Sequence, residues 1–137
     1  MCIKECAKAI DWYIANFGAR EEMRLLGSGG SIAYAQLRIG PAMIMVSDEF
    51  PAFGAFGAVP GVRPPVTIAL QVPNVDAMVQ RALAAGAKVL APVQDHFYGD
   101  RAGTIQDPFG HAWMISTHKE DVSQAEMQRR YDEMTRG

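Results

Sequence analysis

The chain has 137 residues, of which 49% are hydrophobic and 20% charged, with a formal net charge of −2. These values exclude a disordered chain and give no basis for a nucleic-acid partner or an anionic membrane surface. The length suits one domain or two repeated halves. The opening segment MCIKECAKAIDWY carries charge and helical periodicity instead of a signal-peptide core, and no apolar run is long enough to span a membrane. We therefore expect a cytoplasmic protein with no membrane partner.

The chain has two cysteines, Cys2 and Cys6, near its start. A zinc site would need further Cys or His partners at suitable spacing. Cys6 fits the buried face of a helix, so we expect a reduced cysteine that packs in the core; a reactive thiol is the alternative.

The first half predicts one helix followed by strands. An apolar stripe typical of a helix ends at Gly18 and comprises Cys6, Ile10, Tyr13, Ile14 and Phe17. Residues 19–26 and 31–39 read as two strands joined by the hairpin sequence GSGG, and residues 41–47 as a further strand.

Residues 48–65, DEFPAFGAFGAVPGVRPP, lack periodicity and predict a long loop. Its three phenylalanines, Phe50, Phe53 and Phe56, need an apolar surface to cover. One interpretation is a lid over the core and the other is a ligand or dimer contact; the sequence leaves both open.

The second half repeats the pattern. In residues 66–72, Val66, Ile68, Leu70 and Val72 alternate with Thr67, Ala69 and Gln71, which predicts a strand with one apolar face. Asn74 can cap a helix with the stripe Val75, Met78, Val79 and Ala82, closed by Gly86. Strands are expected at 87–93, 102–106 and 112–117.

A last helix opens with Ser123 and Glu126 in capping-box spacing. Its narrow apolar stripe, Met127, Tyr131 and Met134, is expected to pack on the body or on a second subunit.

The two halves match each other, which indicates an internal duplication. FGAREEM at 17–23 parallels AGAKVLA at 85–91, and Gly40 followed by PAMIM parallels Gly110 followed by HAWMI. We therefore expect two βαβββ modules, 1–47 and 66–118, joined by the linker 48–65 and followed by a C-terminal helix within 119–137, all in one domain. The first strand, MCIK, is short, which leaves an open edge and favours pairing across a dimer.

The duplicated unit, the AKAIDWY helix, FGA, YGDR and DPFGH together resemble the vicinal oxygen chelate superfamily, the group of glyoxalases, bleomycin-resistance proteins and extradiol dioxygenases. The resemblance covers nearly the whole chain and implies an α+β fold: two βαβββ modules whose sheets curl into an incomplete barrel, with helices outside and a ligand in the concavity. It also implies a homodimer.

The enzymes of this family hold a divalent metal with His and Glu side chains. Carried over residue by residue, the first ligand position precedes Met1, the second falls on Thr67, the third on Met114 and the fourth near Met45. Thioethers and a hydroxyl are poor donors for a divalent ion, so we expect no metal and no other cofactor.

The resemblance and the strand alternation together place eight residues in the concavity. They are Tyr34, Gln36, Met43, Met45, Thr67, Ala69, Gln71 and Met114. Ile44, Val46, Trp113 and Ile115 then face the helices. This lining suits a bulky, partly apolar small molecule.

Polar side chains near the concavity have two interpretations. His96, Tyr98 and Arg101 are weak catalytic candidates at the pocket mouth; alternatively Asp100 and Arg101 form a pair that fixes the loop, and His96 is solvated. We expect His111 to bond loop backbone. His118, Glu120 and Asp121 are expected to cap or solvate the final helix.

Three functions remain open. The first is a metal-free protein of the bleomycin-resistance type that sequesters a drug or metabolite, a role in antibiotic resistance included. The second is a glyoxalase-like lyase or isomerase acting on a small carbonyl or quinone-type substrate. The third is a structural or regulatory relative without a small ligand.

Overall fold

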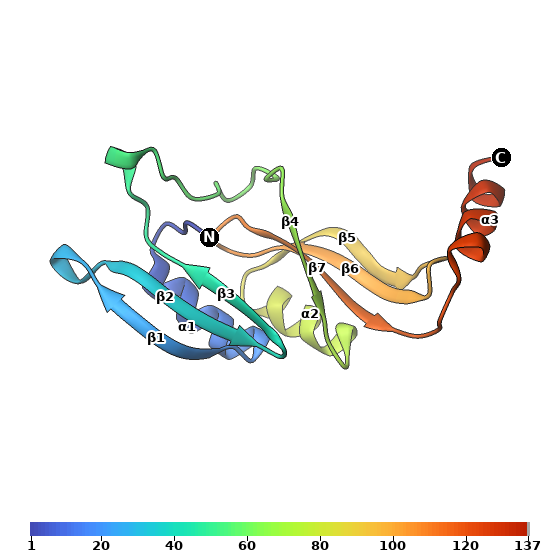
Figure 1. Cartoon of the computed structure of the whole chain (residues 1–137), viewed down its shortest axis with the longest axis horizontal. Coiled ribbons are helices and arrows are strands. Elements are labelled where there is room, and N and C mark those ends of the chain that lie inside the picture. The colour runs from blue at the N-terminus through green and yellow to red at the C-terminus, as the bar shows by residue number, and fades with distance from the viewer. Residues whose placement is uncertain (137) are drawn as a thin grey trace.

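The computed structural model describes residues 1–136 and forms two antiparallel-rich sheets with three α-helices. The first sheet has the order β1-β2-β3, with β1 Arg20–Leu26, β2 Ile32–Ile39 and β3 Ala42–Val46. The second has the order β4-β7-β6-β5, with β4 Thr67–Gln71, β5 Lys88–Asp95, β6 Asp100–Gln106 and β7 Ala112–His118. Helices α1 (Cys6–Phe17) and α2 (Val75–Ala84) lie behind the sheets in Figure 1, and α3 (Gln124–Thr135) stands at one end.

The predicted duplication and α+β fold are confirmed. In the second module β4 runs parallel to β7, from Thr67 opposite Ala112 to Gln71 opposite Ser116. In the first module a single parallel bridge, Cys2 to Ser47, takes the same place beside β3. The amides of Ile3 and Ser47 donate to the carbonyls of Ser47 and Met1 at 2.9 and 3.0 Å. The short first strand is therefore a stub at the position that β4 occupies in full.

The core is continuous between the modules because α1 packs on the first sheet, α2 packs on the second, and the two helices contact each other. The buried residues of α1 are Cys6, Ala9, Ile10, Tyr13, Asn16 and Phe17. Ile14, which the sequence placed on this stripe, is 41% exposed, because it lies one position too far around the helix. Burial raises the pKa of the Cys6 thiol to about 12, with Asp48 adding to the effect. Cys6 is therefore a neutral packing group, as expected.

Both predicted helix caps are present. Asn74 accepts a hydrogen bond from the Ala77 amide, and Ser123 accepts one from the Glu126 amide. Strands β5 and β6 extend two residues beyond the predicted runs toward the hairpin at 96–99, where the amide of His96 donates to the carbonyl of Asp100.

The turn before β7 is organised by one buried carboxylate, Asp107. Its Oδ2 accepts hydrogen bonds from the Tyr13 hydroxyl and the Trp113 indole nitrogen at 2.5 and 2.8 Å. Its Oδ1 accepts from the amides of Phe109 and His111 at 2.9 and 3.1 Å. Burial first and Asp107 second hold the pKa of Tyr13 well above its ordinary value, so the hydroxyl stays a donor. Through these hydrogen bonds, Asp107 joins α1 of the first module to β7 of the second.

The linker 48–65 is not a core lid as a whole, because Phe53 is 89% and Phe56 65% exposed. Its backbone is nevertheless anchored. A Cβ at Gly57 would lie 3.0 Å from the backbone of Cys2, and the Gln106 side chain donates to the Val62 carbonyl at 2.8 Å. Because these phenylalanines are exposed, the other interpretation of the linker, a ligand or dimer contact, stays open.

Two further features concern His111 and the length of the helices. His111 Nε2 lies 2.9 Å from the Cys2 carbonyl oxygen, so this histidine contacts backbone, but the backbone is that of the stub and not of the loop. Along the described part of the chain, helices are too short or too polar to cross a membrane.

Candidate functional site

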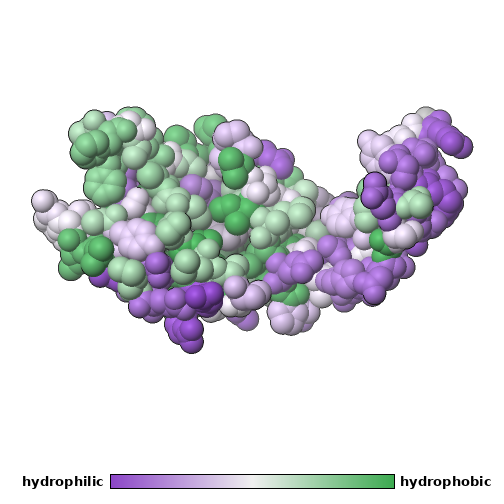
Figure 2. Space-filling view, in the orientation of Figure 1, coloured by the Kyte–Doolittle hydropathy of each residue, from purple (hydrophilic) through white to green (hydrophobic). Residues whose placement is uncertain are grey.

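The face of the first sheet that points away from the helices is open and rich in methionine. We call it the N-face; it comprises Met23 and Leu25 of β1, Tyr34 and Gln36 of β2, and Met43 and Met45 of β3. Met23 lies opposite Gln36 and Leu25 opposite Tyr34, which places them on one side of the sheet. Leu25, Met43 and Met45 are 54%, 44% and 53% exposed. Figure 2 shows apolar side chains gathered over this sheet and the linker.

The charges around the N-face pair with one another. Arg38, which lies opposite Met43 on this face, donates hydrogen bonds to Glu22 at 2.9 and 3.3 Å. Arg24 and Glu21, which lie opposite Ala35 and Leu37 on the helix side, bind each other through two nitrogens. Hydrogen bonding to Arg38 and Arg20 lowers the pKa of Glu22. Because these charges are compensated, the N-face offers soft apolar contact with one hydrogen-bonded pair, Gln36 to Tyr34.

The face of the second sheet that points away from the helices has smaller and more polar side chains. We call it the C-face; it comprises Thr67, Ala69 and Gln71 of β4, Thr104 of β6, and Met114 and Ser116 of β7. Met114 lies between Ala69 on one side and Thr104 on the other. The alternate residues Leu70, Ile105, Trp113 and Ile115 are buried on the helix side. The predicted strand alternation is therefore present in both sheets.

The eight predicted lining residues thus divide between two surfaces, four on the N-face and four on the C-face. The two sheets are separate within residues 1–136, and they form no closed barrel there. A cavity of about 200 Å³ reaches Tyr34 and Met45 on the N-face side and is otherwise lined by Met1, Cys2, Ala33, Val46 and Ser47. One chain therefore presents the predicted lining residues on two separate faces rather than in one enclosed cavity.

The positions that correspond to the family's metal ligands carry unsuitable donors. Thr67 and Met114 lie on the C-face, where Met114 is opposite Ala69, and Met45 lies on the N-face of the other sheet. One hydroxyl and two thioethers do not replace the hydration of a divalent ion. Among residues 1–136, no three His, Cys, Asp or Glu side chains are grouped to hold a metal ion. These residues do not fit the family's metal.

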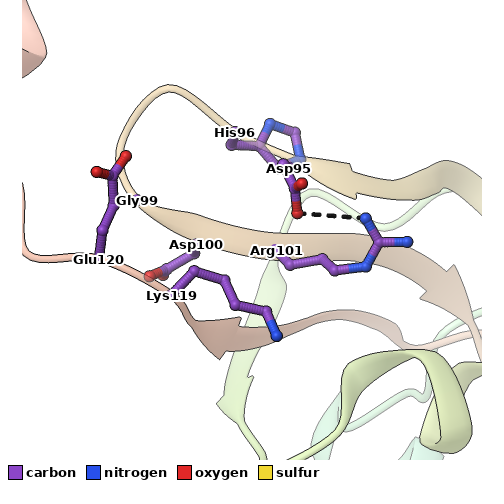
Figure 3. A pocket seen from close by; sticks show the side chains of 7 residues that line it. All are labelled: Asp95, His96, Gly99, Asp100, Arg101, Lys119 and Glu120. Atoms are coloured by element: carbon purple, nitrogen blue, oxygen red, sulfur yellow. Dashed lines mark hydrogen bonds and ion pairs between the residues drawn. The ribbon is translucent and has the colours of Figure 1, made fainter.

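A second, charged cavity of about 450 Å³ lies at the β5–β6 hairpin (Figure 3). Its lining includes His96 and Arg101, together with Asp95, Gly99, Asp100, Lys119 and Glu120. Arg101 is engaged by Asp76 through Nε and Nη2 at 2.8 and 3.0 Å, and by Asp95 at 3.2 Å. The predicted pair of Asp100 with Arg101 is wrong, because Arg101 points to α2 and Asp100 binds His118 instead.

The other two catalytic candidates stack on each other. The rings of His96 and Tyr98 lie 5.1 Å apart with an interplanar angle of 14°. His96 Nε2 lies 3.3 Å from the Ala102 carbonyl oxygen, and burial raises the pKa of Tyr98. This arrangement fixes the hairpin, and it leaves the catalytic role of His96, Tyr98 and Arg101 a prediction.

The expectation that His118 caps or solvates the final helix is wrong, because His118 ends β7 and binds two carboxylates, while Ser123 caps α3. Nδ1 of His118 lies 2.8 Å from Asp100 and its Nε2 2.7 Å from Asp121. Hydrogen bonds to these carboxylates raise the pKa of His118. Alternation along β7 puts His118 on the same side as Met114 and Ser116, at the end of the C-face. The pairing of β6 with β7, which sets Asp100 opposite His118, is the signal that would have found it.

Comparison with known proteins places this geometry in a family. A family model described as Glyoxalase/Bleomycin resistance protein/Dioxygenase superfamily matches residues 1–115. An uncharacterized protein of Mycobacterium tuberculosis is 39% identical over 131 residues, which cover 93% of this chain and 77% of the relative.

Solved structures agree. TioX from Micromonospora sp. ML1 is 28% identical with a TM-score of 0.67, covering 86% of this chain and 94% of TioX. A protein of Pseudomonas aeruginosa is 25% identical with a TM-score of 0.69, covering 88% of this chain and 95% of that protein. The chain belongs to the glyoxalase/bleomycin resistance protein/dioxygenase superfamily.

Proposed function

We propose that this protein binds a bulky, partly apolar small molecule without a metal ion, and so sequesters a drug or a metabolite. The observation that carries the proposal is the N-face, where methionine and leucine side chains stay about half exposed on the first sheet. An apolar surface of this kind, rimmed by polar groups, marks a binding site. Methionine suits a ligand of irregular shape because its side chain is flexible and polarizable.

The two faces supply different contacts to such a ligand. The N-face offers thioethers, a leucine and the Tyr34 ring, and the C-face offers the Thr67 hydroxyl and the Gln71 amide beside Ala69. An aromatic molecule with one hydrogen-bonding edge would satisfy both. Because one chain keeps the faces on separate sheets, a homodimer that sets the N-face of one copy against the C-face of the other would enclose the ligand.

The donor chemistry supports the absence of a metal from this function. The hydroxyl and thioethers at the family's ligand positions give no anionic or imidazole donor to a divalent ion. Ligand binding then rests on shape, apolar contact and a few hydrogen bonds, which is the usual composition of a small-molecule site.

Binding can be measured with two probes, the glycopeptide bleomycin and anthraquinone-2-sulfonate. We expect at least one probe to raise the melting temperature of the wild-type protein and to lose about tenfold in affinity in Met45→Asp, since a buried carboxylate would face the apolar ligand. Val89→Asp is the matched control, because Val89 is half exposed on β5 and lies outside both faces. Equal loss in both variants, or no binding by the wild type, would contradict the proposal.

A glyoxalase-like lyase or isomerase is the second candidate, and one observation favours it. His118 is held by Asp100 at the end of the C-face, which is the arrangement of an oriented acid–base group. This function predicts turnover of a small carbonyl substrate, such as the hemithioacetal of methylglyoxal and glutathione, and loss of turnover in His118→Gln. Probe binding without turnover supports sequestration.

A further inference from the structure

A third cavity, of about 390 Å³, lies between the linker 48–65 and the start of β4. Linker residues 56–58 and 64–65 form one wall, and Met1, Val66, Ile68 and His111 form the rest. In Figure 1 the linker crosses from the end of β3 to the start of β4, and the N-terminus lies below it in this view. We call this site the linker cavity.

The linker cavity lies on the helix side of the second sheet. Ile68 lies opposite Trp113 in the pairing of β4 with β7, and Trp113 is buried toward the helices. Strand alternation puts Val66, the residue before β4, on the same side as Ile68, while Thr67 and Ala69 of the C-face point the other way. A ligand in the linker cavity would therefore contact the residues of neither face.

The wall that the linker supplies is held in place by contacts with the rest of the chain. The Gly57 amide donates to the Glu49 carboxylate at 2.7 Å, and the Gln106 side chain donates to the Val62 carbonyl at 2.8 Å. A Cβ at Gly110 would lie 2.8 Å from the linker backbone, so the turn before β7 packs directly on the linker. Because the loop is already anchored, a ligand would pay little for ordering it.

The lining of the linker cavity is apolar with one exception. Among the described residues that line it, His111 alone has a nitrogen or oxygen in its side chain. A charged ligand would lose hydration there without meeting an acidic, lysine or arginine side chain. The Phe56 ring and the Met1 thioether favour a flat aromatic ligand. The volume is near the lower end of the roughly 300–1,000 Å³ of ligand pockets, which suits one or two fused rings.

His111 offers such a ligand one hydrogen-bond acceptor. Its Nε2 lies 2.9 Å from the Cys2 carbonyl oxygen, which can only accept, so Nε2 carries the hydrogen. In the neutral ring the other nitrogen, Nδ1, is then unprotonated. Within residues 1–136 Nδ1 has no hydrogen-bond partner, and no unpaired side-chain nitrogen or oxygen is buried, so Nδ1 reaches solvent. A single hydroxyl donor on the ligand would match this acceptor.

We propose that the linker cavity binds a neutral aromatic alcohol of one or two rings, of the phenol or naphthol class. The hydroxyl donates to Nδ1 of His111, and the rings lie between Phe56 of the linker and Ile68 of β4. This site is additional to the N-face and the C-face of the proposed function, and it needs no second copy of the chain. It gives Phe56 a ligand to contact.

The hydroxyl contact is tested by titrating the full chain with 2-naphthol and following the fluorescence of the probe at neutral pH. We expect 2-methoxynaphthalene, which has the same rings but no donor, to bind the wild type about fivefold more weakly. His111→Gln keeps a donor for the Cys2 carbonyl but lacks Nδ1, so it should bind both probes equally. No binding of 2-naphthol by the wild type, or a preference that His111→Gln leaves unchanged, would overturn the proposal.

The location is tested by filling the cavity. Val66 is 66% exposed, so Val66→Trp adds volume in the cavity without disturbing the core, and we expect it to weaken 2-naphthol binding about tenfold or more. Val62→Trp is the matched control, because Val62 is 61% exposed on the same linker and lies outside the lining. Melting temperatures check that both variants are folded. Equal losses in the two variants would contradict the assigned site.

Chemical-shift mapping separates the linker cavity from the N-face. On addition of 2-naphthol to the isotope-labelled wild type, we expect the largest changes at the backbone amides of Gly57, Val66 and His111. Largest changes at Met43 and Met45 would place the probe on the N-face and overturn the proposal. This readout uses no N-face variant and no other probe, so it succeeds or fails independently of the proposed function.

Discussion

The two modules share one backbone plan but differ in what they contribute. The second module has a complete first strand, β4, and the anchoring turn of Asp107, whereas the first has a stub at residues 1–3 and a simple Gly40-Pro41 turn. The first module instead carries the exposed methionines of the N-face. The two modules therefore share the order of their strands, but the buried anchoring turn lies in the second module and the exposed apolar face lies in the first.

The largest effect is expected from breaking the anchor of the second module. Asp107→Asn replaces one of two acceptor oxygens by an NH₂ group facing buried donors from Tyr13 and Trp113, or from the turn amides. Unsatisfied buried donors cost about 1–3 kcal/mol each, so we expect the free energy of unfolding to fall by about 2–4 kcal/mol in urea denaturation. Asp95→Asn, an exposed carboxylate, is the control. A loss below about 1 kcal/mol would show that Asp107 is not the anchor.

The second prediction compares two glycines with positive φ, one in each module. Gly18 ends α1 with a φ of 66°, and no neighbouring atom would touch an added Cβ, so Gly18→Ala should cost about 1 kcal/mol for the left-handed backbone alone. Gly99 has a φ of 96°, and a Cβ added there would overlap the Glu120 carbonyl oxygen. Gly99→Ala should therefore cost more, about 2–3 kcal/mol, and should also increase proteolysis between β7 and α3. If Gly18→Ala and Gly99→Ala changed unfolding and proteolysis equally, the overlap predicted between a side chain at Gly99 and Glu120 would be contradicted.

The third prediction compares the two first strands by hydrogen exchange. The stub donates from Ile3 to Ser47, with one further bond from Ser47 to Met1, whereas β4 pairs with β7 along five residues. Local opening of the stub needs fewer broken bonds, so the amide of Ile3 should exchange about tenfold faster than that of Leu70. Equal protection would mean that the stub is held as firmly as β4.

The smallest effect concerns the pH response at the end of the C-face. The pKa of His118 is raised by Asp100 and Asp121, so its contribution to stability is fully present below the ordinary value of 6.5 and is lost as the pH rises through the folded-state pKa. Proton NMR should give a His118 pKa above that value, which Asp100→Asn lowers. Because the ring is exposed, we expect only a small change in stability. An unshifted His118 pKa would contradict the geometry.

Features set by neighbouring residues were predictable from the sequence. The helical stripe of α1, the Asn74 and Ser123 caps, the hairpin between β1 and β2 and the alternation of β4 depend on spacings of a few residues. The repeated pattern and the DPFGH turn then indicated the family fold, which the family match confirms.

Features set by distant residues were not predictable. Tyr13 meets Asp107 across 94 positions, and Arg101 meets Asp76 across 25, so neither pair leaves a local signal. The predicted modules already put four lining residues in each sheet, but strand alternation does not encode that the two sheets stay separate and form no closed barrel. The Asp100–His118 pair depends on the register of β6 with β7.

The most direct test of metal-free binding is a probe titration before and after chelation. Protein purified without chelator is titrated calorimetrically with anthraquinone-2-sulfonate, dialysed against EDTA and titrated again, with metal content measured at both stages. We predict substoichiometric metal throughout and the same affinity in both titrations. Affinity that disappears with EDTA and returns with Mn²⁺ or Zn²⁺ would contradict a metal-free site on the N-face and C-face.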